Sequence, residues 1–160
     1  MTRQQEAQKV RDVIERYTDA INLQDWDALA PLFADKAIWE TRGGPVEVNL
    51  EGREMIVAGL RSIVEGLEFM NQSLGAIVVE VEDTFATARV HLSEVGRDLE
   101  GKGVFNVGLY FDTFTKSSGQ WQFQRRSFRF RYVAQPAQDG FVFKPEPPTD
   151  THRTNKGHKA

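Results

Sequence analysis

The chain has 160 residues, of which 40% are hydrophobic, and this length fits one domain with a core large enough to enclose a cavity. It contains no cysteine, which excludes a disulfide scaffold, a thiolate zinc site and a cysteine nucleophile, and its formal charge of -3 gives no attraction for nucleic acid or an anionic membrane. No apolar run reaches the length of a membrane span and residues 1–10 hold no apolar signal core, so we expect a cytoplasmic protein without a membrane partner.

Residues 1–66 predict three helices and one short strand. Apolar residues at three- and four-residue steps predict a helix over residues 3–23. Asp25 stands where the N-cap of a second, short helix is expected, and residues 37–41 favour a strand. A third helix is expected over residues 53–66. Its buried face should consist of Met55, Ile56, Leu60, Ile63 and Val64.

After Gly66 the hydrophobic pattern changes to that of strands. Four segments are rich in Val, Phe, Thr and Tyr, which suit a pleated sheet: residues 74–82, 84–97, 104–116 and 120–133. Ser117, Ser118 and Gly119 predict a short hairpin loop between the last two. Long strands after a block of helices predict an α+β domain, with N-terminal helices packed on a strongly curved, mostly antiparallel sheet.

The predicted strand over residues 104–114 is apolar on both of its alternating faces. One set is Phe105, Val107, Leu109 and Phe111, and the other is Val104, Tyr110 and Phe114. The helices can cover one face, and a second copy of the chain is the simplest cover for the other. We therefore expect a homodimer, or a higher homo-oligomer, that forms through the sheet.

The pattern of the strands ends at Ala134. Phe141, Val142 and Phe143 form a last apolar cluster, which we expect to pack on the body of the domain or on a neighbouring chain. Residues 144–160 are rich in proline and polar residues and predict a flexible tail, so the domain is expected to span residues 1–143.

Several motifs carry a resemblance to a known family. They are residues 17–29 with 32–39, residues 51–56, and Gly108-x-Tyr110-x-Asp112 followed by Gly119-x-Trp121 and Arg126. In these motifs the chain resembles the SnoaL-like branch of the NTF2-like superfamily, to which polyketide cyclases, ketosteroid isomerase and scytalone dehydratase belong. The resemblance covers about residues 8–133 and implies a cone-shaped α+β fold whose open end holds a mostly apolar ligand.

The resemblance also implies roles for single positions. The Asp and His pair of the dehydratases falls on Asn22 and Gln72, and the base of the isomerases falls on Thr41. An amide cannot exchange a proton near neutral pH, so this chain departs from its relatives where their chemistry is done. Tyr17 and Asp112 match the pair that donates hydrogen bonds to a substrate oxygen in the isomerases, and we expect them to be catalytic.

Asp112 lies in mid-strand, where a buried carboxylate must be hydrogen-bonded, paired or protonated. A protonated Asp112 beside a tyrosine hydroxyl would stabilise an oxyanion, whereas the alternative is a structural pair with Arg126. Tyr17 points inward, either to a ligand or to a backbone or water partner. Gly108 either opens space or marks a bulge. The residues expected to bind substrate are Trp39, Asn22, Gln72, Asn106, Tyr110, Phe114 and Arg126.

Other polar residues carry weaker signals. His91 alternates with Arg89 and Ser93, which predicts a solvent or dimer contact and makes it a poor candidate for a general base. No second histidine or carboxylate cluster accompanies it, so we expect no metal and no cofactor. The net negative charge argues against nucleic acid as the partner of the arginines between residues 125 and 131.

These observations predict an enzyme, a lyase, isomerase or cyclase that acts on an apolar ring-containing molecule. Asn22 and Gln72 leave a rival interpretation open, a non-catalytic ligand-binding or dimerisation module. A third is the small subunit of a ring-hydroxylating dioxygenase, which shares the fold, although this chain offers no cluster ligands.

Overall fold

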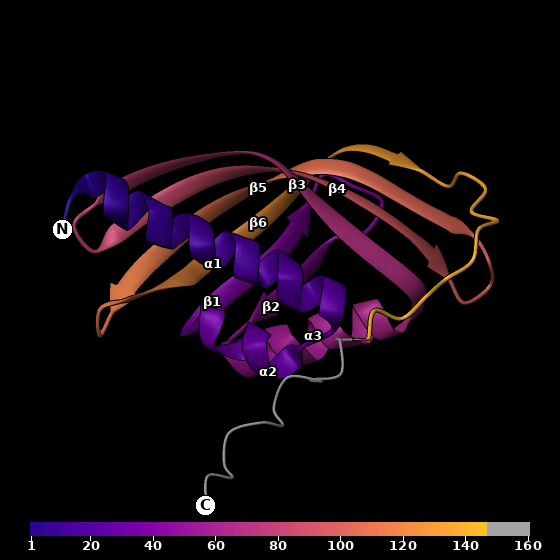
Figure 1. Ribbon diagram of the computed structural model, residues 1–160, viewed down its shortest axis with the longest axis horizontal. Helices are drawn as coiled ribbons and strands as arrows, with labels where there is room; N and C mark the ends of the chain where they lie inside the picture. Colours follow the sequence, from indigo (N-terminus) through magenta and orange to yellow (C-terminus); the bar gives the residue numbers. More distant parts are fainter. Residues whose placement is uncertain (147–160) are drawn as a thin grey trace, which may run out of the picture.

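Helices pack into the hollow of a curved six-stranded sheet in this protein (Figure 1). The computed structural model describes residues 1–146. The strand order is β2-β1-β6-β5-β4-β3. All pairs are antiparallel except β1 with β6, which are parallel. The expected α+β cone with a mostly antiparallel sheet is therefore confirmed.

Helix α1 spans Arg3–Leu23, as the periodicity predicts. Thr2 and Gln5 form a capping box, in which each side chain satisfies the backbone N–H of the other residue. The apolar stripe, which includes Val10, Ile14 and Tyr17, is buried against the sheet. The stripe therefore fixes which face of α1 points into the cone.

Glu6 attaches the first turn of α1 to the far end of the sheet. Its Oε2 accepts hydrogen bonds from Lys116 Nζ at 2.8 Å and from Trp121 Nε1 at 2.7 Å. The Lys116 and Trp121 bonds lower the pKa of Glu6 to about 2. The carboxylate is thus ionised in any ordinary buffer, and it holds α1 along the sheet.

The chain then passes through short elements to the edge of the sheet. Asp25 caps α2 (Trp26–Leu29) by accepting the Ala28 N–H, as expected. A 3₁₀ turn leads to β1 (Phe33–Arg42), which is longer than the predicted strand. The sequence analysis does not predict β2 (Val48–Glu51), because four residues carry too little alternation to be recognised.

Helix α3 spans Arg53–Glu65 and buries a narrower face than predicted. Ile56, Leu60 and Val64 are buried, but Met55 is 59% exposed and Ile63 is 43% exposed. The prediction was wrong for these two residues, because α3 contacts the sheet along a single stripe at the open end of the cone.

Four long antiparallel strands form the rest of the sheet. They are β3 (Leu67–Glu82), β4 (Phe85–Asp98), β5 (Gly103–Ser117) and β6 (Gln120–Ala134). β3 begins seven residues before the predicted strand, at Leu67 rather than residue 74. The hairpin between β5 and β6 turns at Ser118 and Gly119, with φ of 51° and 78°, and both angles are typical of a two-residue turn.

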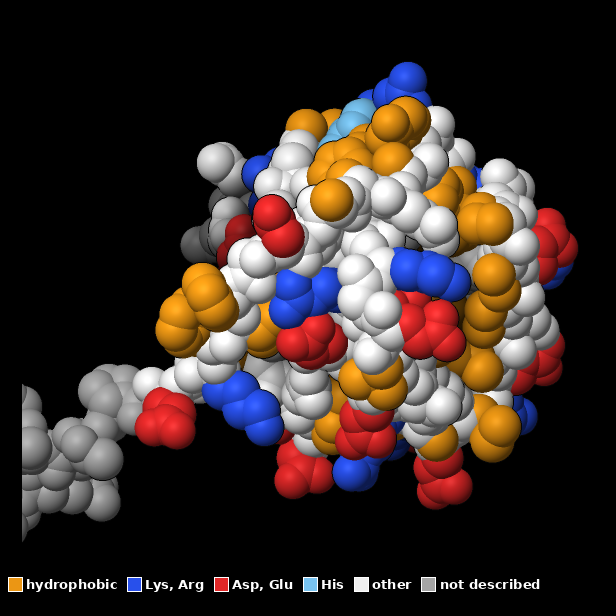
Figure 2. Space-filling view, turned by 90° about the vertical axis from the view of Figure 1, so that its right-hand side faces the viewer, with side chains coloured by type: hydrophobic (Ala, Val, Ile, Leu, Met, Phe, Trp, Pro, Cys, Tyr) orange, Lys and Arg blue, Asp and Glu red, His pale blue; other side chains and the backbone are white. Residues whose placement is uncertain are grey.

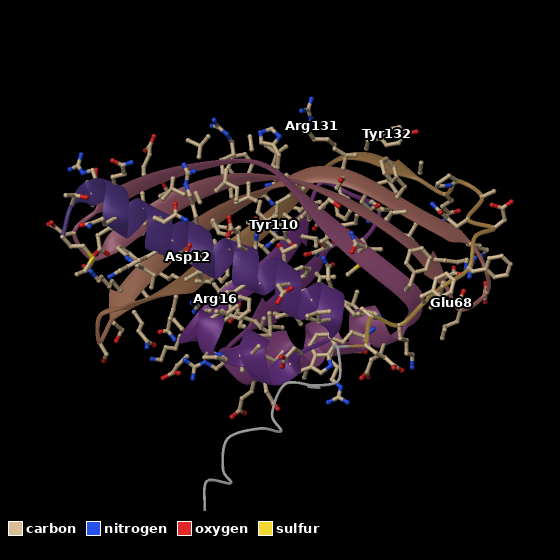
Figure 3. All side chains as sticks on the ribbon, viewed as in Figure 1. Asp12, Arg16, Glu68, Tyr110, Arg131 and Tyr132 are labelled. Atoms are coloured by element: carbon tan, nitrogen blue, oxygen red, sulfur yellow. The ribbon has the colours of Figure 1, made fainter. Side chains whose placement is uncertain are left out.

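The two faces of β5 have different environments, as their alternation predicts. Tyr110 and Phe114 are buried on the inner face, whereas Phe111 on the outer face is 48% exposed. The sheet bulges between Val107 and Gly108, so that the neighbouring Tyr132 on β6 also faces outward. Figure 3 shows Tyr132 on the outer side of the sheet and Tyr110 between the sheet and the helices.

The segment after β6 runs along the open end of the cone. Arg97 holds it by donating hydrogen bonds to the carbonyl groups of Gln138 and Gly140. Phe141 is 90% exposed and Phe143 is also exposed, so the expectation that this cluster packs on the body is wrong for the single chain. Figure 2 shows this end of the molecule, where hydrophobic side chains lie among charges of both signs. Most of the predicted tail, residues 147–160, lies outside the described residues.

No helix within residues 1–146 combines the length and the apolar character that a membrane crossing requires.

Candidate functional site

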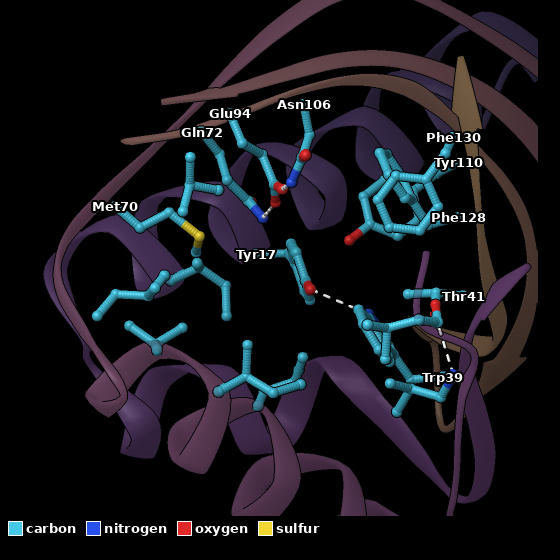
Figure 4. Close-up of a pocket in the computed structure, with 18 residues that line it drawn as sticks. Tyr17, Trp39, Thr41, Met70, Gln72, Glu94, Asn106, Tyr110, Phe128 and Phe130 are labelled. Carbon is cyan, nitrogen blue, oxygen red and sulfur yellow. Dashed lines mark hydrogen bonds between the residues drawn. The ribbon is translucent and has the colours of Figure 1, made fainter. Parts of the chain in front are cut away.

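An apolar cavity of about 290 Å³ lies between the inner face of the sheet and helices α1 and α3 (Figure 4). Leu60, Ile63 and Val64 of α3 and Ile21 of α1 contribute to its walls. This volume is close to the lower limit of roughly 300 Å³ for ligand pockets, so the cavity suits a small molecule. The polar or partly polar side chains in its lining are Tyr17, Trp39, Thr41, Gln72, Glu94, Asn106 and Tyr110.

Three of these polar residues form one row across three neighbouring strands. Gln72 of β3 pairs with Glu94 of β4, and Glu94 pairs with Asn106 of β5. Glu94 Oε1 accepts a hydrogen bond from Gln72 Nε2 at 2.8 Å, and its Oε2 accepts one from Asn106 Nδ2 at 3.1 Å. The two amides hold the carboxylate in one orientation at the wall of the cavity.

Glu94 is a charged residue of the cavity wall that the sequence analysis missed. It belongs to the same alternating set of β4 as Val90 and Leu92, both of which are buried on the inner face. That alternation places a carboxylate where an apolar side chain is expected. The sequence therefore contained a signal for this residue, namely a glutamate at a position where the alternation of β4 predicts a buried apolar side chain.

Tyr17 and Tyr110 contribute hydroxyl groups to the same cavity. Trp39 Nε1 donates a hydrogen bond to the Tyr17 hydroxyl at 3.1 Å. Because an indole N–H only donates, the Tyr17 oxygen is the acceptor in this bond, and its own proton is left for another partner. Burial raises the pKa of Tyr17 and raises that of Tyr110 well above its usual value, so both remain protonated donors.

A buried arginine lies behind these two tyrosines. The Arg126 guanidinium carbon is 4.0 Å from the centroid of the Tyr17 ring and 3.8 Å from that of Tyr110. Its Nε is 3.4 Å from Asp112 Oδ1. No side-chain nitrogen of Arg126 and neither oxygen of Asp112 has a hydrogen-bond partner within residues 1–146. Burial raises the pKa of Asp112 to about 7, although the charge of Arg126 acts in the opposite direction.

Only some of the residues expected to be catalytic or to bind substrate line the cavity. Tyr17, Trp39, Gln72, Asn106 and Tyr110 do so. The other four are Asp112, Arg126, Phe114 and Asn22, and they do not. Asp112 lies beside Arg126, as the structural alternative expects, and both side chains lie outside the cavity lining.

Phe114 and Asn22 have structural contacts instead. Phe114 packs on Phe123, with 4.7 Å between the ring centroids. The Asn22 Oδ1 accepts the backbone N–H of Gln72 at 2.7 Å, and its Nδ2 donates to the backbone carbonyl of Gln72 at 3.0 Å. The two positions that match the dehydratase pair are therefore neighbours in space, joined by two hydrogen bonds between the Asn22 side chain and the Gln72 backbone.

Three further residues from the sequence analysis have defined positions. Thr41 lines the cavity, and its hydroxyl donates to the Val46 carbonyl. Gly108 lies at a bulge and is covered by Phe128, whose Cζ would be 2.4 Å from an added Cβ, so no larger residue fits there. His91 is half-buried outside this cavity. Within residues 1–146 no three potential metal ligands of the His, Cys, Asp or Glu type come together.

In NTF2-like proteins a curved sheet and the helices packed against it form a cone, with an apolar cavity at the open end. This protein has that architecture. The family of SnoaL-like domains matches residues 3–127, and the chain belongs to this family. No curated protein matches the chain significantly in sequence.

Solved structures share the fold. A candidate scytalone dehydratase from Novosphingobium aromaticivorans is 22% identical with a TM-score of 0.71, over 83% of this chain and 89% of that one. The hexachlorocyclohexane dehydrochlorinase LinA-type3 from Novosphingobium barchaimii is 19% identical with a TM-score of 0.76, over 91% and 97%. An NTF2-like protein from Novosphingobium aromaticivorans is 25% identical with a TM-score of 0.66, over 80% and 84%. Identities this low relate the folds only.

Proposed function

We propose that this protein is an enzyme of the lyase or isomerase type that acts on a small, apolar, ring-containing molecule. The observation that carries the proposal is the apolar cavity, whose wall combines a carboxylate with tyrosine hydroxyls. Apolar walls bind a ring, and a few polar groups orient it. A candidate dehydratase and a dehydrochlorinase among the structural neighbours support an elimination or a related proton transfer.

The hydroxyl of Tyr17 is the group that would bind a substrate oxygen. Trp39 donates to its oxygen and does not occupy its proton, so the proton can be donated to a carbonyl or hydroxyl group of the substrate. The positive charge of Arg126 acts on the tyrosine rings from behind and partly offsets the effect of burial on the Tyr17 pKa. In this proposal Asp112 is a positioning residue that acts through Arg126.

The first test is a thermal-shift measurement with hydroxylated aromatics, lactones and steroids. A ligand present at a hundred times its dissociation constant adds about 2.7 kcal/mol to the free energy of unfolding. We expect a ring compound to raise the melting temperature of the wild type. Ile63→Trp should abolish the shift, because Ile63 lies at the cavity wall and a larger side chain there fills the space.

Met55→Trp is the matched control, since Met55 is exposed on the same helix and does not line the cavity. It should leave the shift unchanged. If no ring compound stabilises a folded wild type, or if both tryptophan variants respond as the wild type does, the cavity is not the ligand site and the proposal is wrong.

A non-catalytic ligand-binding module is the second candidate, and the amides of Asn22 and Gln72 favour it. It requires ring compounds to bind in the thermal-shift experiment without any of them being converted to product.

A further inference from the structure

We infer that a hollow on the outer face of the sheet binds a phosphate group, carried by a small phosphorylated molecule or free in solution. This outer hollow has a volume of about 230 Å³, and its polar side chains are Ser73, His91, Ser93 and Arg131. None of these residues lines the apolar cavity, which lies on the inner side of the sheet. The inference therefore goes beyond the proposed function and does not depend on it.

Two irregularities of the sheet border the outer hollow. The register of β3 with β4 shifts between Leu74 and Ile77. The register of β5 with β6 shifts between Val107 and Gly108, and Arg131 has no register partner on β5. Such bulges bend a strand and change the direction of the side chains beside them. Figure 3 shows Arg131 on the outer side of the sheet, pointing away from the helices.

Gly75 and a pair of serines form the β3 side of the outer hollow. A Cβ atom on Gly75 would be 3.1 Å from the His91 Cβ, which is closer than side chains usually approach, so a larger residue would crowd this wall. Ser73 and Ser93 are register partners on β3 and β4. Side chains of directly opposed residues are neighbours, and both hydroxyl groups therefore border the same space.

The outer hollow holds hydrogen-bond donors and no negative charge. The Arg131 guanidinium can only donate, and the His91 imidazole donates from at least one nitrogen in either protonation state. The Ser73 hydroxyl accepts a hydrogen bond from Asn71 Nδ2 at 3.4 Å, which leaves its own proton for another acceptor. No residue that lines the hollow is acidic. Within residues 1–146, Arg131 takes part in no ion pair.

The surroundings of the outer hollow are also positive. A neighbouring hollow on the same face is lined by three arginines and two glutamates, which are Arg89, Arg125, Arg129, Glu40 and Glu80. One positive charge is therefore left over there, in addition to the charge of Arg131. Clustered charge of one sign attracts ligands of the opposite sign and raises their local concentration. The outer hollow is thus suited to an anion.

A phosphate group matches these donors better than a carboxylate does. It has three strong acceptor oxygens that point in different directions, so donors from β3, β4 and β6 can meet it at the same time. A carboxylate has two oxygens in one plane, and a single arginine satisfies both in a bidentate pair. The serines and the histidine would then have no role in binding.

Calorimetric titration tests this assignment with sodium phosphate, phenyl phosphate and sodium acetate in a chloride buffer of constant ionic strength. We expect the wild type to bind one phosphate per chain. Arg131→Gln should weaken this binding about 10–100-fold, the usual effect of removing a charged hydrogen-bond donor. Because Arg131 is exposed, the variant should fold as the wild type does.

Arg16→Gln is the matched control, because Arg16 is an exposed arginine on α1 and its loss changes the net charge by the same amount. It should bind phosphate as the wild type does. Ser73→Asp is a second variant at an exposed position, where the new carboxylate would face Arg131 and repel an anion. It should abolish binding. In NMR spectra of the wild type, phosphate should shift the amide signals of Ser73 and Ser93.

Three results would overturn the inference. They are unchanged phosphate binding by Arg131→Gln, acetate binding as tight as phosphate binding, and a wild type that binds no phosphate. The last result, together with binding by Phe111→Glu, would show that a second copy of the chain occupies the outer hollow. When phosphate binds as expected, a higher affinity for phenyl phosphate identifies a phosphorylated organic molecule as the ligand, and equal affinities identify free phosphate.

Discussion

Asp112 and Glu94 both carry a carboxyl group on the inner side of the sheet, but the two carboxyl groups differ in their hydrogen bonding. Glu94 accepts two hydrogen bonds from amides, whereas Asp112 accepts none and has only Arg126 beside it. A carboxylate without hydrogen bonds in the interior is destabilised relative to its neutral form. A carboxyl group is therefore held as a hydrogen-bond acceptor at Glu94 and is favoured as a neutral acid at Asp112.

The raised pKa of Asp112 predicts how stability depends on pH. Below about pH 4 the carboxyl group is protonated in both states, and between about pH 4 and 7 the unfolded chain releases the proton that the folded chain keeps. The free energy of unfolding should therefore fall as the pH rises through this range, by about 1.4 kcal/mol per pH unit from this group. Asp112→Asn should remove this contribution in urea titrations at several pH values.

Asp27→Asn serves as the control, since Asp27 is exposed on α2. The fall in the free energy of unfolding that depends on Asp112 should persist in this variant. A constant difference between Asp112→Asn and the wild type from pH 4 to 7 would contradict the prediction.

At the scale of elements, Asn22 connects the end of α1 to β3. Its side chain accepts the backbone N–H of Gln72 and donates to the Gln72 carbonyl. The end of the helix is therefore hydrogen-bonded to the backbone of the strand. The connection positions Gln72, and Gln72 in turn holds Glu94. A residue that does not line the cavity thus supports its wall.

Asn22→Asp should destabilise the protein, because a carboxylate accepts the Gln72 N–H but faces the Gln72 carbonyl without a proton to donate. The loss of this part-buried hydrogen bond should cost about 1–3 kcal/mol, measured by urea unfolding at neutral pH. Asn49→Asp, at an exposed position on β2, should change little. Equal stabilities for the wild type and Asn22→Asp would show that the connection to β3 contributes nothing.

At the scale of the whole molecule, the outer face of the sheet stays uncovered in a single chain. Its exposed apolar residues include Val78, Phe111 and Tyr132, the last of which is 58% exposed. Exposed apolar groups gathered on one face of a sheet are typical of an interface. The homodimer through this face remains a prediction.

Sedimentation of the wild type should give the mass of a dimer, and Phe111→Glu should give that of a monomer, because the charge would be buried in the interface. Leu99→Glu is the control, since Leu99 is exposed in the turn after β4. It should leave the dimer intact. A wild type that sediments as a monomer at all concentrations would refute the predicted interface.

The sequence alone determined the order of the three helices and the long strands, without the short strand β2, and the direction of many side chains. The three-residue and four-residue steps of α1 fix Tyr17 as an inward residue, and the alternation of β5 fixes Tyr110 and Phe114 on one face. These are local properties, since they depend on backbone geometry within one helix or one strand. The motifs that resemble the SnoaL-like family predicted the cone-shaped fold.

Only the tertiary structure decided which inward residues meet at the cavity. Glu94 reaches its amides because strand register sets Gln72 and Asn106 beside it, and register depends on pairing between residues far apart in the sequence. Asp112 shares the inward face of Tyr110, but its register partner is Arg126 and it does not line the cavity. Alternation gives the face of a strand, whereas long-range pairing selects the neighbours, and the chemistry of this site depends on the neighbours.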